Sequence, residues 1–153
     1  MELLSIIRNK PMFEHFTEEE LNQFNSLEFT TRSYKKEETI FKKGELYSSL
    51  YLLVRGTVSV NRIDLERQLY VLAPGDVFGE ISFLTRTLRH STVIAKDDAL
   101  VIEIDDCFFD KISRSMERKI KNYFIDLLLS RLKNINETLI QMARYSVGYN
   151  LEL

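Results

Sequence analysis

The feature that most constrains the fold is a long stretch in which apolar residues recur at every second position. This period of two is read from about residue 27 to residue 105: Val58 and Val60 alternate with polar residues in the run 57–61, and aliphatic residues take every second position of the runs 50–54 and 100–104. A period of two is typical of a β-strand with one buried face. Turn signals separate the runs, at Lys43-Gly44, Arg55-Gly56, 64–66 and Pro74-Gly75. The pattern predicts half-buried antiparallel strands that form a jelly roll or a barrel.

Helical patterns flank the strand region on both sides. Thr17 is followed three residues later by Glu20, the pairing of a capping box, so a short helix is expected to begin at Thr17. After the strands, Asp105 or Asp106 can cap another short helix that carries Phe108. The longest element is expected to be a helix over about residues 115–145. The chain is therefore predicted to be mainly β with flanking helices.

Six apolar residues of the long helix lie on one line. They follow one another at intervals of 3, 4, 3, 4 and 3 residues, at Ile125, Leu128, Leu132, Ile135, Leu139 and Met142. This is the a/d spacing of a left-handed coiled coil, and it predicts a homodimer joined along the helix. The alternative is a helix packed back on its own barrel, which usually takes a wider apolar face. Gly148 is expected to end the ordered part, which leaves residues 146–153 as a tail.

Size and charge limit the classes of function. A chain of 153 residues, 44% of them hydrophobic, suits one domain with its own core, placed at residues 1–145. The net charge of −2 gives no overall basic field, so direct binding to nucleic acid is not expected. The longest apolar runs are far below the ~20 residues that span a bilayer, so no membrane association is expected. No basic-then-apolar signal peptide opens the sequence, and we expect a cytoplasmic protein.

Few side chains could support catalysis or hold a metal. The two histidines, His15 and His90, lie far apart in the sequence, so no metal site is expected. No pairing of a nucleophile with a base is visible, and neither an enzyme nor a resident cofactor is expected. Cys107 is the one cysteine, which excludes an intrachain disulfide. We expect it to be a small buried hydrophobic residue rather than a redox sensor.

The segment from Phe78 to Val93 carries the chemistry of a binding site. Gly79 and Glu80 begin a tight turn, and Arg89 follows nine residues after Glu80. Glycine lets backbone N–H groups approach phosphate oxygens at the start of a short helix. The arginine fork matches two phosphate oxygens, and a buried carboxylate can accept hydrogen bonds from ribose hydroxyls. The segment predicts a sugar-phosphate site; the alternative is a surface ion pair between Glu80 and Arg89.

Three blocks in this order resemble the cyclic nucleotide-binding domain of catabolite-activator-type regulators, cyclic-nucleotide-dependent kinases and gated channels. Residues 78–95 are similar to the phosphate-binding cassette of that family, and residues 41–58 and 72–80 resemble its other signatures. The resemblance covers roughly residues 10–140. It implies an eight-stranded antiparallel jelly roll, with the cassette between the sixth and seventh strands and a long helix after the barrel.

The resemblance implies that the chain binds a cyclic purine mononucleotide. Glu80 would accept from the ribose 2′-hydroxyl, and Arg89 would hold the cyclic phosphate. The long helix would pair two subunits and bring Asn136 near the purine, although Asn136 could equally be an ordinary exposed position. The site residues implied in this way are Phe78, Gly79, Glu80, Ile81, Ser82, Arg89, His90, Ser91 and Asn136.

The sequence does not decide which purine base is preferred or what the long helix controls. Many family members carry a small residue or threonine after the arginine, where this chain has His90, so cAMP is expected over cGMP only as the family's commoner ligand. The long helix is expected to signal to an unidentified effector protein. The alternatives are the sensory half of a transcription regulator, since no helix-turn-helix follows in this chain, and a ligand-free dimerisation module.

Overall fold

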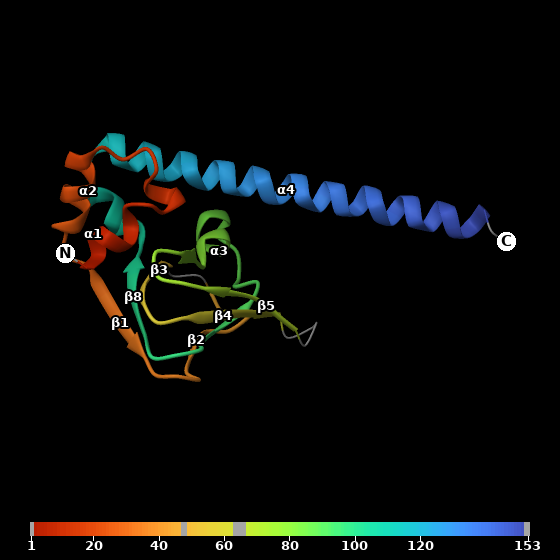
Figure 1. Cartoon of the computed structure of the whole chain (residues 1–153), viewed down its shortest axis with the longest axis horizontal. Coiled ribbons are helices and arrows are strands. Elements are labelled where there is room, and N and C mark those ends of the chain that lie inside the picture. Colours follow the sequence, from red (N-terminus) through yellow and green to blue (C-terminus); the bar gives the residue numbers. More distant parts are fainter. Residues whose placement is uncertain (1, 47–48, 63–66, 152–153) are drawn as a thin grey trace.

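Two four-stranded antiparallel sheets form the centre of the computed structural model, which describes residues 2–46, 49–62 and 67–151. The strand order is β1-β8-β3-β6 in one sheet and β2-β7-β4-β5 in the other (Figure 1). The strands are β1 Thr30–Tyr34, β2 Thr39–Phe41, β3 Leu50–Arg55, β4 Val58–Arg62, β5 Arg67–Leu72, β6 Val77–Phe78, β7 Thr92–Ala95 and β8 Ala99–Ile104. The expected eight-stranded antiparallel jelly roll is confirmed.

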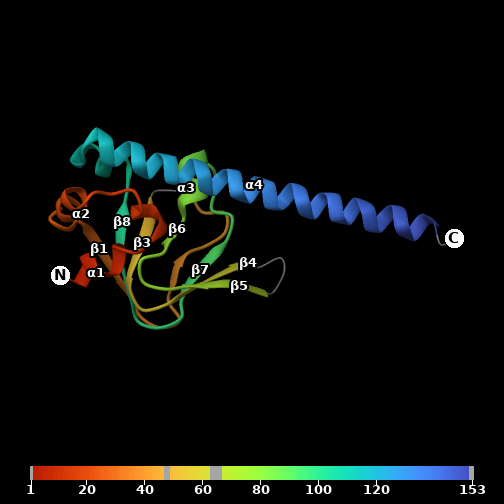
Figure 2. The same ribbon diagram turned by 45° about the horizontal axis from the view of Figure 1, so that its top comes forward.

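Helices gather at one end of this sandwich and over one of its faces (Figure 1). They are α1 Glu2–Ile7, the 3₁₀ helix η1 Pro11–Phe13, α2 Glu18–Asn25, α3 Glu80–Thr85, the 3₁₀ helix η3 Asp106–Lys111 and α4 Arg114–Leu151. The short helix α3 lies between β6 and β7, so the expected position of the cassette is confirmed. In both ribbon views α3 lies at the side of the sandwich that faces α4 (Figure 2).

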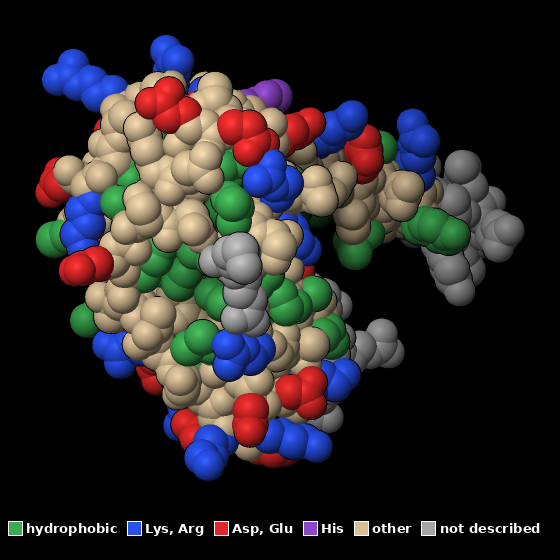
Figure 3. Space-filling model, turned by 60° about the vertical axis from the view of Figure 1, so that its left-hand side comes forward, with side chains coloured by type: hydrophobic (Ala, Val, Ile, Leu, Met, Phe, Trp, Pro, Cys, Tyr) green, Lys and Arg blue, Asp and Glu red, His purple; other side chains and the backbone are tan. Residues whose placement is uncertain are grey.

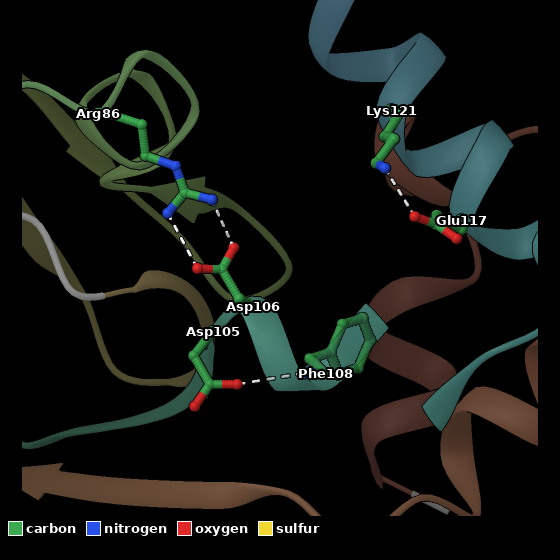
Figure 4. A network of polar contacts seen from close by, with 6 residues as sticks. All are labelled: Arg86, Asp105, Asp106, Phe108, Glu117 and Lys121. Atoms are coloured by element: carbon green, nitrogen blue, oxygen red, sulfur yellow. Dashed lines mark hydrogen bonds and ion pairs between the residues drawn. The ribbon is translucent and has the colours of Figure 1, made fainter. Parts of the chain in front are cut away.

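The predicted helix starts are confirmed at the level of single hydrogen bonds. The Thr17 hydroxyl accepts from the Glu20 N–H at 3.1 Å, and a Glu20 carboxylate oxygen accepts from the Thr17 N–H at 3.0 Å. This reciprocal pair is the capping box that the sequence predicted for α2. At η3, the sequence left Asp105 and Asp106 as alternatives. The Asp105 carboxylate is the cap, because it accepts from the Phe108 N–H at 3.1 Å (Figure 4).

The prediction of half-buried strands is wrong for β3 and β8, which are buried on both faces. Leu52 and Ile102 belong to a cluster shared with the helices, whereas Leu53 and Val101 belong to a second cluster between the two sheets. All four side chains are at most 3% exposed. The helical end of the molecule covers the face that would otherwise meet water. Alternation therefore identifies residues that share a face, but it does not identify the face that is solvated.

Helix α4 is 38 residues long and has two different halves. Its first turns are anchored in the core by Met116, Ile120 and Phe124, which are at most 2% exposed. Residues 132–146 are all exposed, and this part of the helix projects away from the sandwich (Figure 2). The expected end near Gly148 is wrong, because the helix continues to Leu151. An internal glycine costs a helix only about 1 kcal/mol relative to alanine, which is too little to terminate it reliably.

The apolar line on α4 is exposed where the helix projects. Leu132, Ile135, Leu139 and Met142 are each between 55% and 61% exposed, so these side chains do not pack on the chain's own barrel. Figure 3 shows hydrophobic side chains on the projecting part, interspersed with Lys, Arg, Asp and Glu. No helix in the described part of the chain has the length and apolar character that crossing a bilayer requires.

Candidate ligand pocket

A small open pocket of about 70 Å³ lies beside α3 and collects most of the predicted site residues. Its lining includes Phe78, Gly79, Glu80, Ile81, Ser82, Arg89, His90 and Ser91. Three further lining residues come from strands of the second sheet and were not predicted as site residues: Phe41, Val60 and Val93. Their sequence signal was the alternation of the strands around the cassette, which marks residues of one face without saying that the face borders a cavity.

Gly79 is the N-cap of α3 and makes room for the arginine. Its φ of 74° lies in the left-handed region that glycine adopts at little cost. A Cβ atom at this position would lie 2.8 Å from Nη1 of Arg89 and 3.2 Å from Cε2 of Phe41. Glycine is therefore needed at this position for two reasons: it adopts the left-handed φ of the turn, and its missing Cβ lets the guanidinium approach the backbone.

Arg89 is the central charge of the pocket and is only 3% exposed. Its Nη1 donates to the carbonyl of Gly79 and to the hydroxyl of Ser82, both at 2.8 Å, and its Nη2 donates to the carbonyl of Ser49 at 2.5 Å. All three acceptors are uncharged oxygens. They fix the direction of the guanidinium without cancelling its charge, and a buried charge is costly unless it is compensated.

Aromatic rings form one wall around this cation. The guanidinium carbon of Arg89 lies 4.2 Å from the centre of the Phe41 ring and 5.7 Å from that of Tyr51. The rings of Tyr51 and Phe78 stack at 5.3 Å. Burial lowers the pKa of Arg89, and the nearby Tyr51, Glu45 and Glu80 act in the opposite direction. Arginine stays protonated in proteins even so, which leaves a rigid, desolvated cation at the pocket.

Glu80 and the second candidate arginine, Arg86, lie in different surroundings. Glu80 is the first residue of α3, lines the pocket and is 4% exposed. Arg86 forms a two-bond ion pair with Asp106 of η3, at 2.9 and 2.7 Å (Figure 4). Hydrogen bonding to Arg86 lowers the pKa of Asp106. Arg86 is not among the residues that line the pocket, so the arginine placed at the site is Arg89.

The remaining predicted residues lie at the rim or away from the pocket. His90 is exposed, and its Nε2 lies 2.9 Å from the hydroxyl of Thr87. Asn136 is exposed on the projecting part of α4 and does not line the pocket, so its contact with a base stays a prediction. Cys107 is exposed, which makes the expectation of a buried cysteine wrong. Across the described residues, no group of three or more His, Cys, Asp and Glu side chains could hold a metal ion.

Comparison with known proteins shows the family. Residues 31–115 match the family model of the cyclic nucleotide-binding domain, which is more than half of the chain. The chain belongs to this family. It is 33% identical over 101 residues to the cyclic AMP receptor protein of Thermus thermophilus, an alignment that covers 64% of this chain and 46% of that protein. The resemblance read from the cassette residues is thereby confirmed.

Solved structures of the family have the same fold. The catabolite activator protein of Thermus thermophilus superposes with a TM-score of 0.77 at 27% identity, over 88% of this chain and 63% of that chain. The regulatory domain of Toxoplasma gondii PKA with cAMP superposes with a TM-score of 0.61 at 26% identity, over 74% of this chain and 44% of that chain. This chain spans about half the length of the curated relatives, 46% and 52% in two cases.

Proposed function

We propose that this cyclic nucleotide-binding domain binds cAMP, in preference to cGMP, in the pocket beside α3. The observation that carries the proposal is the buried guanidinium of Arg89, which lines the pocket and is held by three uncharged oxygens. A cyclic phosphate would give this buried cation an anionic partner, with the bidentate geometry that arginine favours. The preference for cAMP is supported by the similarity of the chain to a cyclic AMP receptor protein and to a PKA regulatory domain solved with cAMP.

Three further residues contact the ligand in the proposed pose. Glu80 would accept from the ribose 2′-hydroxyl, because its carboxylate lines the pocket and is nearly excluded from water. Ser82 and Ser91 would donate to phosphate oxygens from either end of the cassette, and both line the pocket. His90 and Asn136 remain candidates for the base.

We further propose that α4 conveys ligand binding to a partner and that it pairs two copies of the chain. A second copy is favoured because the exposed residues Leu132, Ile135, Leu139 and Met142 keep the alternating intervals of a two-helix seam. The chain would act as a regulatory domain at residues 1–145 for an effector that is a separate protein. The alternatives stay the sensory half of a transcription regulator and a ligand-free dimerisation module.

Titration calorimetry of the full chain with cAMP and with cGMP tests the binding proposal. We expect one site per chain, with cAMP bound more tightly. Arg89→Ala should weaken binding by about 2–4 kcal/mol, since it removes the charge that faces the phosphate. Arg86→Ala is the matched control, because Arg86 is bound to Asp106 outside the pocket, and it should retain wild-type affinity. Loss of binding in Arg86→Ala but not in Arg89→Ala would refute the assignment, and no heat with either nucleotide would favour the ligand-free module.

A further inference from the structure

A chain of hydrogen bonds continues from the pocket into the space between the two sheets. It starts at Ser49, which directly precedes β3 and is fully buried. The Ser49 carbonyl accepts from Nη2 of Arg89 at 2.5 Å, and the Ser49 hydroxyl donates to Oε1 of Glu103 at 2.6 Å. One residue therefore contacts the arginine with its backbone and a carboxylate with its side chain.

Glu103 is an acidic residue on the inner face of β8. It shares that face with Val101, which belongs to the cluster between the sheets, and its side chain is 15% exposed. Its second carboxylate oxygen accepts from Nε of Arg32 on β1 at 2.6 Å. Burial alone would raise the pKa of Glu103, but the hydrogen bonds from Ser49 and Arg32 outweigh it and lower the pKa. The carboxylate is therefore ionised at neutral pH, which makes it a strong acceptor.

None of Ser49, Glu103 and Arg32 lines the pocket, so these residues act on a ligand there only through other groups. The ionised carboxylate fixes the direction of the Ser49 hydroxyl, and this anchors the residue whose carbonyl holds Nη2 of Arg89. A charge-assisted hydrogen bond of this kind is stronger than a neutral one. Sites that bind a phosphate depend on such support, because a fork-shaped cation gains its two parallel bonds only in the correct orientation.

We propose that Glu103 and Ser49 are positioning residues that hold Arg89 in the orientation in which it binds the cyclic phosphate, with Arg32 keeping Glu103 in place. The inference rests on the proposed function and adds a second set of residues to it. It also gives a role to an acidic side chain that lies between two sheets, a place where apolar residues are usual.

The test is a double-mutant cycle on the full chain, with cAMP affinity from calorimetry as the readout. Ser49→Ala removes the hydroxyl and keeps the carbonyl, and Glu103→Gln removes the charge at almost constant volume. Each is expected to weaken cAMP binding about tenfold, the scale of one hydrogen bond to a charged group. Because Ser49→Ala removes the bond and Glu103→Gln removes its charge assistance, both changes act on the same bond, and the double variant should bind no more weakly than the weaker single variant. Glu18→Gln, which removes an exposed ion pair with Arg8, is the control and should bind as the wild type does.

Thermal unfolding without ligand separates positioning from a structural role. Positioning predicts weaker binding at a nearly unchanged unfolding temperature. Single variants that unfold earlier but bind cAMP with wild-type affinity would overturn the inference, as would losses of affinity that add in the double variant. Tighter binding in Glu103→Gln would also overturn it, because the carboxylate would then act on the phosphate only by repulsion. A wild-type chain that binds no cyclic nucleotide would overturn the proposed function together with this inference, whereas binding that none of the variants changes would overturn the inference alone.

Discussion

Replacing Gly79 by alanine should test how closely Arg89 and the backbone of α3 depend on each other. The new Cβ would lie 2.8 Å from Nη1 of Arg89, a distance that unbonded carbon and nitrogen atoms do not adopt, so the guanidinium must move. Nη1 makes two of the three hydrogen bonds of this side chain. Their loss should cost about 2–3 kcal/mol at about 1 kcal/mol net or slightly more for each bond. The left-handed φ of 74° adds about 1–2 kcal/mol for any residue with a Cβ.

Gly44 provides a matched control for this experiment. Its φ is 90°, so alanine there has the same kind of backbone cost, but no atom lies within 4 Å of the position of the new Cβ. Urea unfolding should therefore show a loss of about 1–2 kcal/mol for Gly44→Ala and of about 3–5 kcal/mol for Gly79→Ala. Calorimetry with cAMP should show weaker binding for Gly79→Ala alone. Equal losses of stability in the two variants would refute the argument, because they would show that Arg89 is free to move aside.

Two other outcomes are expected for the whole chain. Replacing Leu132 and Leu139 together with Glu puts like charges into both halves of a two-fold seam, so sedimentation should show a folded monomer in place of a dimer. A folded dimer of unchanged mass would contradict the seam. Burial raises the pKa of Glu20, but hydrogen bonds from Lys119 and Thr17 outweigh it and lower this pKa below the ordinary 4.5. The ionised carboxylate therefore stabilises the folded chain above pH 4.5, and this stabilisation is lost as the pH falls through the lowered pKa. Urea unfolding should show that the free energy of unfolding declines as the pH falls, and Glu20→Gln should make this decline less steep. An equally steep decline in the variant would contradict the role of Glu20.

The residues that line the candidate pocket were easier to predict from the sequence than the contacts that surround them. Gly79, Glu80 and Arg89 are close in sequence, and a short segment with a fixed turn brings them to one pocket, so their pattern alone was enough to predict that they lie together. The contact between Ser49 and Glu103 joins residues that are 54 positions apart, and no spacing rule reports it. Glu103 in fact falls on the polar side of the alternation in β8.

Other errors came from local signals that longer-range structure outweighs. Gly148 resembles a helix end, but the helix continues beyond it to Leu151. Cys107 is apolar enough to be buried, yet it lies in η3, directly after Asp106, whose side chain is on the surface in its ion pair with Arg86. Which strand faces are covered was not predictable either, because the covering helices come from both ends of the sequence. Local patterns describe faces and turns, and tertiary packing decides what covers them.

Because α4 is one continuous helix, its anchored turns and its exposed end must move together. At 1.5 Å per residue, the part that follows Phe124 extends about 40 Å from the core to Leu151. A tilt of roughly 5° at the anchored turns would then displace the far end by about 3.5 Å, given that length. If the turns that carry Met116, Ile120 and Phe124 tilted, a change too small to disturb the core would become a displacement large enough to alter a contact at the far end of the helix.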